Sequence, residues 1–347
     1  MKLKMNHSLG RKIIFSSITL LLSLIVLIVS GELICRYFLD EYLDDFKIDE
    51  RNLNYRYDEN FGWFPIPNLQ GTFTGNQTIH FKNNSLGFRD IEHGEKKKPR
   101  LLFLGDSFVW GYDVEQDQLF TDKIQEMIPD WEIINLGVSG YGTDQEYLLL
   151  QKYFDYYKPD IVFLIFNRSD YIDNELNINY GAYFKPFYEV ENNDLKLKGV
   201  PVPKSANYYY SEYQSLFSKS YFLKAILKAY KVFFTPKALK LSNPTFYIVS
   251  DMKNFTEKKG SIFIMGSYIH ENVMPQLEEL DNILLSYINN NNMNHIRLKT
   301  DFVYYSHGFH WTPRGHIMIT DEIYNYLKEN NFLELQPKTI NKLNTSE

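Results

Sequence analysis

The stretch RLLFLGDSFVWG, residues 100–111, decides the fold class of this chain. Its run from Leu101 to Leu104 is continuously apolar rather than alternating, which is typical of a strand covered on both faces of a sheet. Gly105 then allows a tight turn, and Ser107 stands at the strand tip, where a helix can follow. The stretch therefore predicts a buried parallel strand with a polar residue at its carboxyl end.

Further apolar runs of strand length alternate with helical patterns along the chain. The runs are WEIINLG (131–137), DIVFLIF (160–166), GSIFIMG (260–266) and a weaker one, HIRLKTDF (295–302). Stretches with apolar residues three and four apart lie at 117–128, 144–157, 244–259 and 271–288. Repeated strand and helix units with right-handed crossovers predict an α/β sandwich around a parallel sheet.

Two segments do not follow this repeat. Residues 32–96 contain a charged juxtamembrane linker and then short, turn-rich segments that predict a small β-rich lead-in. Residues from about 175 to 240 interrupt the α/β pattern with a predicted hairpin and an aromatic, basic helix at 215–234. The pattern favours an extra packing layer for this insertion, with a wall over the active site or a membrane-facing surface as the alternative. The main domain is expected at 97–330, followed by a tail at 331–347.

The N-terminus predicts a membrane anchor. Residues 13–30 carry no charge and, as a helix, would span about 27 Å, close to the hydrocarbon thickness of a bilayer. Basic residues within 1–12 precede the apolar run and mostly acidic ones follow it, so the positive-inside bias places residues 1–12 in the cytoplasm. A cleaved signal peptide is disfavoured by the length of the run and by its exit sequence. We expect a single-pass anchor over 13–31 in the cell (inner) membrane, with the main domain periplasmic or at the cell surface.

Composition excludes several classes of protein. The net charge of -6 and interspersed Lys and Glu give no basic face for nucleic acid. Cys35 is the only cysteine, so an intramolecular disulfide and a multi-cysteine metal site are excluded. His307, His310 and His316 cluster in SHGFHWTPRGH (306–316), but the spacing lacks the intervening Glu of HExxH. No metal and no cofactor are predicted, and TPRGH reads as a helix start that includes His316.

Polar residues at three predicted strand ends suggest acyl transfer. Ser107 alone would be read as a helix cap. The chain also supplies a histidine base in GFHWTPRGH, glycines in GVSGYG whose backbone N–H groups can approach a ligand, and amide or hydroxyl donors in FNRSD. A nucleophile, a base and oxyanion donors are the three requirements of serine-based ester chemistry.

Four blocks in this order resemble those of the GDSL/SGNH hydrolase family. They are LLFLGDSFVWG, NLGVSGYGTDQ, FNRSDYIDN and HWTPRGH, over about residues 97–330. The upstream NNSLGFRD is similar to a motif of the membrane-anchored bacterial members. The resemblance implies a three-layer, flavodoxin-like sandwich and ester hydrolysis or acyl transfer without metal. It makes Ser107 the nucleophile and His310 the base, with the N–H groups of Ser107 and Gly140 as oxyanion donors.

The chain departs from the family pattern at two positions. The usual Asn donor of the third block is replaced by Ser169, and Asn167, two residues earlier, is the alternative donor. The usual Asp three residues before the base is His307, and the position two residues before is glycine. A neighbouring histidine cannot stabilise an imidazolium as a carboxylate does. Either a backbone carbonyl orients His310, or a carboxylate such as Asp301 does so from elsewhere.

These observations lead to two hypotheses of different classes. The first is a membrane-anchored, outward-facing serine esterase, deacetylase or O-acyltransferase that acts on acyl esters, such as O-acetyl groups of cell-surface polysaccharide. The second is a catalytically weak or inactive module of the same fold that binds glycan or scaffolds a surface-assembly complex. A nucleotide-binding flavodoxin-like domain is disfavoured because the chain lacks a Gly-rich phosphate loop followed by Lys. Partners predicted here are the acyl-ester substrate and the lipid bilayer.

Overall fold

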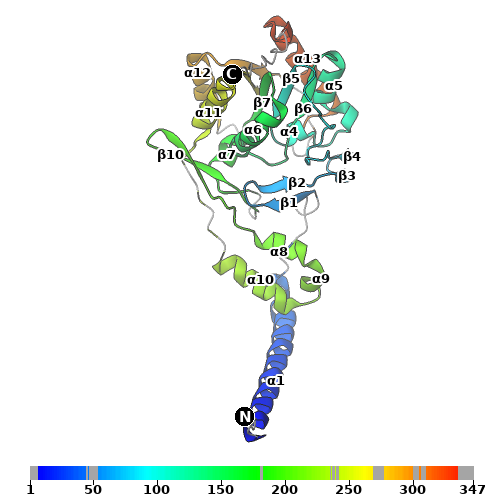
Figure 1. Ribbon diagram of the computed structural model, residues 1–347, viewed down its shortest axis with the longest axis vertical. Coiled ribbons are helices and arrows are strands. Elements are labelled where there is room, and N and C mark those ends of the chain that lie inside the picture. Colours follow the sequence, from blue (N-terminus) through cyan, green and yellow to red (C-terminus); the bar gives the residue numbers. More distant parts are fainter. Residues whose placement is uncertain are drawn as a thin grey trace, which may run out of the picture. The chain divides into compact units, whose positions relative to one another are not determined.

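The computed structural model describes residues 7–43, 46, 54–179, 183–234, 236, 239, 242–268, 277–299, 305 and 310–334. The chain divides into two compact units. The smaller comprises residues 1–53 and 204–237, and the larger comprises 54–203 and 238–347. The larger unit contains the predicted sheet, and the smaller contains the N-terminal helix and the helices of the insertion (Figure 1).

A five-stranded parallel sheet forms the centre of the larger unit. Its strands are β5 (Arg100–Leu104), β6 (Glu132–Asn135), β7 (Ile161–Asn167), β12 (Ile262–Tyr268) and β13 (Asn294–Leu298). They lie in the order β13-β12-β7-β5-β6, and every neighbouring pair is parallel. When these five strands are numbered 1 to 5 along the chain and read from the β6 edge, their order is 2-1-3-4-5, which is the flavodoxin-like order. The predicted α/β fold class is therefore confirmed.

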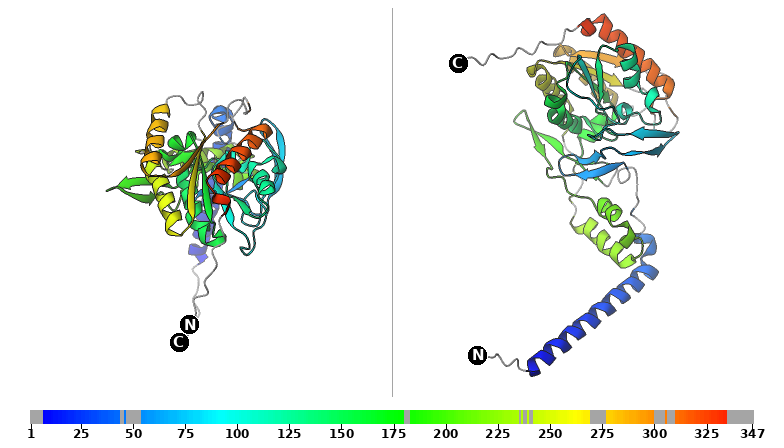
Figure 2. Two further views of the ribbon diagram at one scale, coloured as in Figure 1. Left: turned by 90° about the horizontal axis from the view of Figure 1, so that it is seen from above. Right: turned by 45° about the vertical axis from the view of Figure 1, so that its right-hand side comes forward.

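Helices cover both faces of this sheet. On one face lie α5 (Phe120–Met127) and α13 (Pro313–Glu329), and on the other α6 (Thr143–Tyr157), α11 (Thr245–Lys258) and α12 (Glu278–Asn290) (Figures 1 and 2). Shorter helical segments are α4 (Ser107–Trp110), η1 (Gln116–Gln118), α7 (Ser169–Asn174) and η3 (Phe332–Glu334). The side chains of β5 and those of β7 up to Phe166 are buried between the layers, as their continuous apolar runs predict, whereas the edge strand β13 is mostly partly exposed.

Four antiparallel pairs of short strands complete the larger unit. They are β1 (Tyr55–Asp58) with β2 (Gly62–Pro65), β3 (Gln70–Thr74) with β4 (Thr78–Lys82), β8 (Ile178–Asn179) with β9 (Tyr183–Phe184), and β10 (Phe187–Glu191) with β11 (Asp194–Lys198). The first two pairs confirm the β-rich lead-in. Trp63 connects the lead-in to the loop after β6, because its indole N–H donates to the Ser139 carbonyl (3.1 Å) and its own carbonyl accepts from the Tyr141 hydroxyl (2.6 Å).

The smaller unit is helical. It contains α1 (His7–Phe38), α2 (Asp40–Leu43), α8 (Ala206–Glu212), α9 (Gln214–Phe217) and α10 (Tyr221–Phe233). Within α1, Gly10–Phe38 is long and apolar enough to cross a membrane, a property that signal sequences share. Its apolar side chains are exposed, so they do not form a protein core.

Candidate active site

Ser107 lies at the first turn after β5, at the carboxyl end of the sheet. The Asp106 carboxylate caps α4 by accepting a hydrogen bond from the Phe108 N–H (2.9 Å). The turn requires glycine at 105, since a Cβ there would lie 2.3 Å from the Val109 side chain and 3.3 Å from the Ile165 carbonyl oxygen. The capped turn therefore presents the Ser107 hydroxyl at the edge where ligands bind in open α/β sheets.

His310 meets Ser107 from the other end of the chain. The distance from His310 Nε2 to Ser107 Oγ is 2.8 Å, although the two residues are 203 positions apart. The fully buried Trp311 holds the backbone next to His310, because its ring packs against Phe108 and Tyr268. The predicted Ser107 and His310 thus lie within hydrogen-bond distance, which a nucleophile and its base require.

The surroundings of His310 favour the neutral imidazole. The Tyr112 ring stacks on the imidazole with centroids 4.3 Å apart, and the Phe108 ring lies 5.2 Å away. Burial lowers the pKa of His310 to about 4, and the nearby Asp113 carboxylate partly opposes this shift. At neutral pH the ring is therefore unprotonated, so one of its nitrogens is able to accept a proton.

Asp113 is the carboxylate near His310 that the sequence did not indicate. Its Oδ2 lies 4.0 Å from His310 Nδ1, longer than a hydrogen bond but close enough for strong attraction to an imidazolium. The side chain is fully buried and accepts hydrogen bonds from Asn76 Nδ2 (2.7 Å) and the Gln77 N–H (3.2 Å). Asp113 also has a positive φ of 65°, which is uncommon outside glycine and is often found at functional turns.

Two other side chains were considered for this role in the sequence. His307 and Asp301 lie outside the described residues, so the structure places neither of them. The one available signal for Asp113 was its position in the turn that follows the nucleophile, in GDSFVWGYD. Aspartate tolerates left-handed turns, so that signal alone is compatible with an ordinary turn residue.

Arg89, from the predicted NNSLGFRD motif, holds the loop that carries Asp113. It is 1% exposed, and its guanidinium donates to the carbonyls of Gly111 (2.7 Å) and Val114 (2.8 Å) and, at longer distances, of Trp110 and His80. Burial lowers its pKa to about 10, which leaves it charged at neutral pH. The lead-in thereby fixes the backbone on both sides of Asp113.

Replacing Arg89 with glutamine is expected to destabilise the fold. The carbonyls of Gly111 and Val114 would lose buried donors, and the expected loss of unfolding free energy is roughly 3 kcal/mol. Denaturant titration of the full-length chain in detergent would measure it. Arg56→Gln, an exposed arginine of β1, is the matched control, and equal midpoints for the two variants would contradict the assigned contact.

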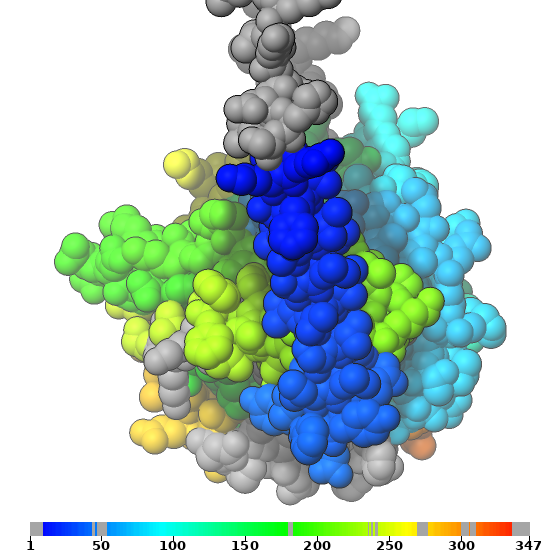
Figure 3. Space-filling model, turned by 90° about the horizontal axis from the view of Figure 1, so that it is seen from below, coloured from blue at the N-terminus to red at the C-terminus, as the bar shows by residue number. Residues whose placement is uncertain are grey.

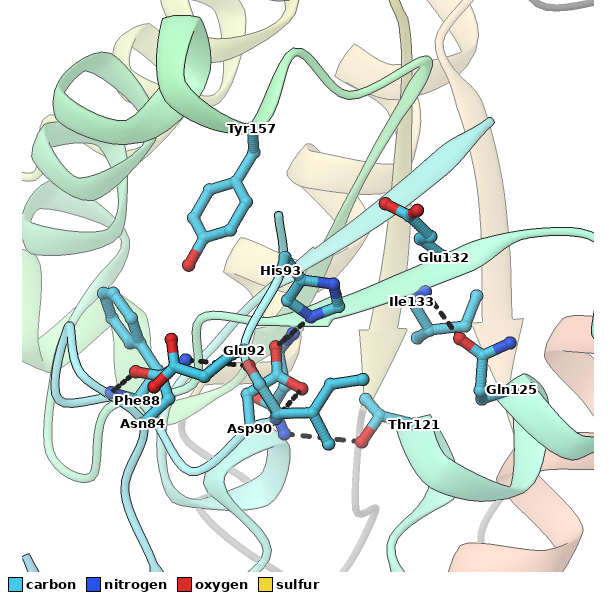
Figure 4. A network of polar contacts seen from close by, with 12 residues as sticks. Asn84, Phe88, Asp90, Glu92, His93, Thr121, Gln125, Glu132, Ile133 and Tyr157 are labelled. Carbon is cyan, nitrogen blue, oxygen red and sulfur yellow. Dashed lines mark hydrogen bonds and ion pairs between the residues drawn. The ribbon is translucent and has the colours of Figure 1, made fainter. Parts of the chain in front are cut away.

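The second half of the same motif ties the lead-in to the sheet (Figure 4). The buried Asp90 accepts hydrogen bonds from His93 Nε2 (2.9 Å) and from the Asn135 N–H (2.9 Å) at the end of β6. The Asn135 amide in turn donates to the Val109 carbonyl of α4 (2.8 Å). NNSLGFRD is therefore connected to the helix that begins with Ser107.

The two predicted backbone oxyanion donors have no acceptor in the described part of the chain. They belong to Ser107 itself and to Gly140, which has a φ of 77°. The loop that carries Gly140 packs tightly on α4, since a Cβ at Gly137 would lie 2.3 Å from the Trp110 nitrogen. Neither predicted backbone donor is therefore engaged by another group in the described part of the chain.

The third oxyanion donor was predicted to be either Asn167 or Ser169, and these two side chains have different hydrogen-bond partners. Asn167, the last residue of β7, donates from Nδ2 to Asp106 Oδ2 (2.9 Å), and its Oδ1 accepts from the Ser169 N–H (2.9 Å). Ser169 is the first residue of α7, and its side chain hydrogen-bonds the Asp173 carboxyl group. One amide hydrogen of Asn167 is therefore already engaged with the cap of α4.

A group of buried carboxyl groups lies behind this region. Its members are Asp106, Asp144, Glu146 and Asp170, and the partly buried Asp173 lies beside them. The buried Lys185 ion-pairs with Asp144, whereas neither Glu146 oxygen has a hydrogen-bond partner among the described residues. Burial, followed by repulsion from Asp170 and Asp106, raises the pKa of Glu146 well above its usual value. Glu146 therefore retains its proton above the pH at which an exposed glutamate ionises.

Replacing Glu146 with glutamine is expected to stabilise the protein increasingly as pH rises. Above the usual glutamate pKa the unfolded chain releases a proton that the folded chain keeps, so wild-type stability falls until the folded-state pKa is reached. The Glu146→Gln variant does not lose stability in this way. The difference in unfolding free energy between the variant and the wild type should therefore grow by at most about 1.4 kcal/mol per pH unit. Thermal melts from about pH 5 to about pH 8 would measure it. Glu126→Gln on the exposed face of α5 is the control, and parallel curves for wild type and Glu146→Gln would refute the assignment.

His316 takes no part in the Ser107–His310 pair. It lies in the first turn of α13, whose N-cap Thr312 accepts a hydrogen bond from the Gly315 N–H (3.2 Å) with Pro313 at the first position. The imidazole is buried, stacks on Phe120 and accepts from the Phe120 N–H (3.3 Å). This confirms the predicted helix start and places His316 in the packing between α13 and α5.

Solved structures similar to this chain carry hydrolase names. TesA is 12% identical, covers 66% of this chain and 98% of its own, with a TM-score of 0.42. The psychrotrophic esterase EstA from Pseudoalteromonas sp. is 13% identical, and the match covers 68% of this chain and 100% of EstA, with a TM-score of 0.41. A lipase/acylhydrolase from Enterococcus faecalis is 14% identical, and the match covers 67% of this chain and 96% of that chain, with a TM-score of 0.38. No family model and no curated protein matches. Several of the similar structures are named GDSL-family proteins, the family that the four sequence blocks resemble.

Proposed function

We propose that this protein is a membrane-anchored serine esterase that acts on acyl esters outside the cytoplasm. The observation that carries the proposal is the 2.8 Å contact between Ser107 Oγ and His310 Nε2 at the carboxyl edge of the parallel sheet. A serine with a neutral histidine at this distance can be deprotonated as it attacks, which is the requirement for acyl transfer.

In the proposed first step, His310 Nε2 takes the Ser107 proton while Oγ attacks the ester carbonyl. The carbonyl oxygen becomes an oxyanion, which the N–H groups of Ser107 and Gly140 stabilise. The imidazolium is stabilised by the Asp113 carboxylate, and it returns the proton to the leaving alcohol as the C–O bond breaks. Ser107 is then acylated.

The second step decides between hydrolysis and transfer. His310 removes a proton from an acceptor hydroxyl, whose oxygen attacks the acyl group. As the bond between the acyl carbon and Ser107 Oγ breaks, His310 returns the proton to Oγ and the free serine is restored. Water as the acceptor gives an esterase or deacetylase, and a sugar hydroxyl gives an O-acyltransferase. Asn167 and Ser169 are the residues proposed to add a third oxyanion donor.

The proposed substrate class follows from the side of the membrane on which the larger unit is expected to lie. α1 is apolar and is preceded by basic residues, which supports an anchor with the larger unit facing outward. Acyl esters abundant outside that membrane include O-acetyl groups on cell-surface polysaccharide. We therefore propose an acylated glycan as the substrate class.

The competing function is a silent module that binds glycan or scaffolds an assembly. It is favoured by two observations: the Asp113 carboxylate stands 4.0 Å from His310, and one Asn167 amide hydrogen is bound to Asp106. Both weaken the machinery relative to a fully hydrogen-bonded triad with three donors.

Labelling by a fluorophosphonate probe separates these functions. Full-length protein in detergent is expected to be modified on Ser107, because only an activated serine attacks the phosphorus. Ser107→Ala should abolish labelling, while Ser286→Ala, on the exposed face of α12, should leave it unchanged. Absence of labelling in the wild-type protein would establish the silent alternative.

A further inference from the structure

Helix α10 presents three different faces. Leu227 and Tyr230 face the interior of the smaller unit, where Leu227 is 5% exposed and packs with Phe46 and Ala206. A lysine face is formed by Lys224, Lys228 and Lys231. The third face, at spacings of four, three and four, consists of Phe222, Ile226, Ala229 and Phe233. Ile226 is 52% exposed and Phe233 is 76% exposed, so an apolar stripe faces outward.

The lysine face is directed toward the protein. Lys228 Nζ donates to the Tyr42 carbonyl (2.9 Å) and lies 4.1 Å from the Tyr42 ring centroid. Lys231 lies 5.8 Å from the Phe46 ring centroid. These contacts fix the rotation of α10 about its own axis, and they leave the apolar stripe rather than the lysines uncovered.

The beginning of α10 is attached to α1 at the end of its apolar run. The Glu32 carboxylate accepts from the Ser220 hydroxyl (2.8 Å) and from the N–H groups of Tyr221 (3.2 Å) and Phe222 (3.0 Å). Gly31 packs on the Phe222 ring, since a Cβ there would approach it to 2.7 Å. Because Glu32 follows the uncharged run 13–30 by two residues, this junction lies at the surface of any bilayer that α1 spans.

The orientation of α10 suits that position. It runs across the C-terminal end of α1 rather than along it (Figures 1 and 2). The two helices are in contact, and α1 overlies the helices of the insertion in the view from below (Figure 3). A helix in the plane of the interface, with one apolar face, buries that face at the boundary between headgroups and acyl chains. The exposed Val232 (60%) and Phe234 (75%) extend the apolar surface at the end of α10.

We propose that α10 is an interfacial helix that lies on the outer leaflet and inserts its Phe222, Ile226, Ala229 and Phe233 stripe into a phospholipid bilayer. The occupant is lipid rather than a second copy because the stripe is continuous with the apolar, exposed surface of α1 through the Gly31–Phe222 contact. The inference rests on the proposed membrane anchor. Among the roles predicted for the insertion at about 175–240, the inference selects a membrane-facing surface for α10.

Lipid quenching tests this inference in the full-length chain. On a Cys35→Ala background, Ile226→Cys and Phe233→Cys variants are labelled with an environment-sensitive fluorophore and placed in phosphatidylcholine nanodiscs that contain a shallow spin-labelled lipid. Lys224→Cys, on the opposite face of α10, is the matched control, and Leu21→Cys reports on α1 with a deep spin label. We expect several-fold stronger quenching and bluer emission at 226 and 233 than at 224, and deep quenching at 21.

Three outcomes would overturn the inference in distinguishable ways. Quenching at 21 with water-like, unquenched emission at 226 and 233 would refute the interfacial helix and leave the anchor standing. Blue emission without lipid quenching at 226 and 233 would indicate that a second copy covers the stripe. Absence of quenching at all three positions would refute the anchor and the interfacial helix together.

Discussion

Replacing Ser107 with alanine is expected to lower kcat/KM for p-nitrophenyl acetate by at least about a thousandfold. The substitution removes the only hydroxyl within hydrogen-bond distance of His310 Nε2 in the described part of the chain. The proposed oxyanion donors at Ser107 and Gly140 are backbone groups and remain in place. Residual activity should therefore come from these donors and from binding alone.

The second half of the pair provides a sharper form of this test. His310→Ala should cause a loss of similar size, and the double variant should be no slower than either single one, since the two groups act as a unit. Ser286→Ala controls for loss of an unrelated hydroxyl. Additive losses, or wild-type rates in Ser107→Ala, would sink the assigned nucleophile.

Replacing Asp113 with asparagine is expected to lower kcat by about a hundredfold to ten-thousandfold. The change keeps the size of the side chain but removes the negative charge 4.0 Å from His310 Nδ1. The imidazolium formed in the transition state then lacks a counter-charge, whereas substrate binding is hardly affected. KM should therefore change much less than kcat.

The pH profile distinguishes this electrostatic role from a structural one. Activity requires neutral His310, so kcat/KM of the wild type should be lost as pH falls through the His310 pKa of about 4. The Asp113 carboxylate raises that pKa against the effect of burial, so Asp113→Asn should move the acid limb to lower pH. Asp117→Asn, an exposed aspartate in η1, is the control. A slower variant with an unmoved acid limb would reduce Asp113 to a structural residue.

The strands and the main helices could be predicted because their signals are local. A continuous apolar run such as Leu101–Leu104 can be satisfied only where both faces are covered, and this predicts a central parallel strand. Thr312 and Pro313 begin α13 for equally local reasons of capping and fixed φ. The ordered sequence blocks, through their resemblance to the GDSL/SGNH family, led to the prediction of Ser107 as nucleophile and His310 as base.

The acid could not be predicted because its relation to His310 is tertiary. The expected position was three residues before the base, and that residue, His307, lies outside the described part of the chain. Asp113 instead approaches from the turn after the nucleophile, held at a positive φ by Asn76 and by the backbone N–H of Gln77 in the lead-in. No spacing rule relates position 113 to position 310.

The sequence by itself determined the elements and their order, since these follow from apolar periodicity and turn residues, and it predicted the side chains that the proposed reaction uses. Only the tertiary structure decided which carboxylate faces His310, that Arg89 holds the loop carrying it, and that α10 leaves an apolar stripe uncovered. The physical reason is that burial, charge proximity and exposure depend on contacts between segments far apart in the chain. A hydrogen bond across 203 residues is formed by the fold, not by any local pattern.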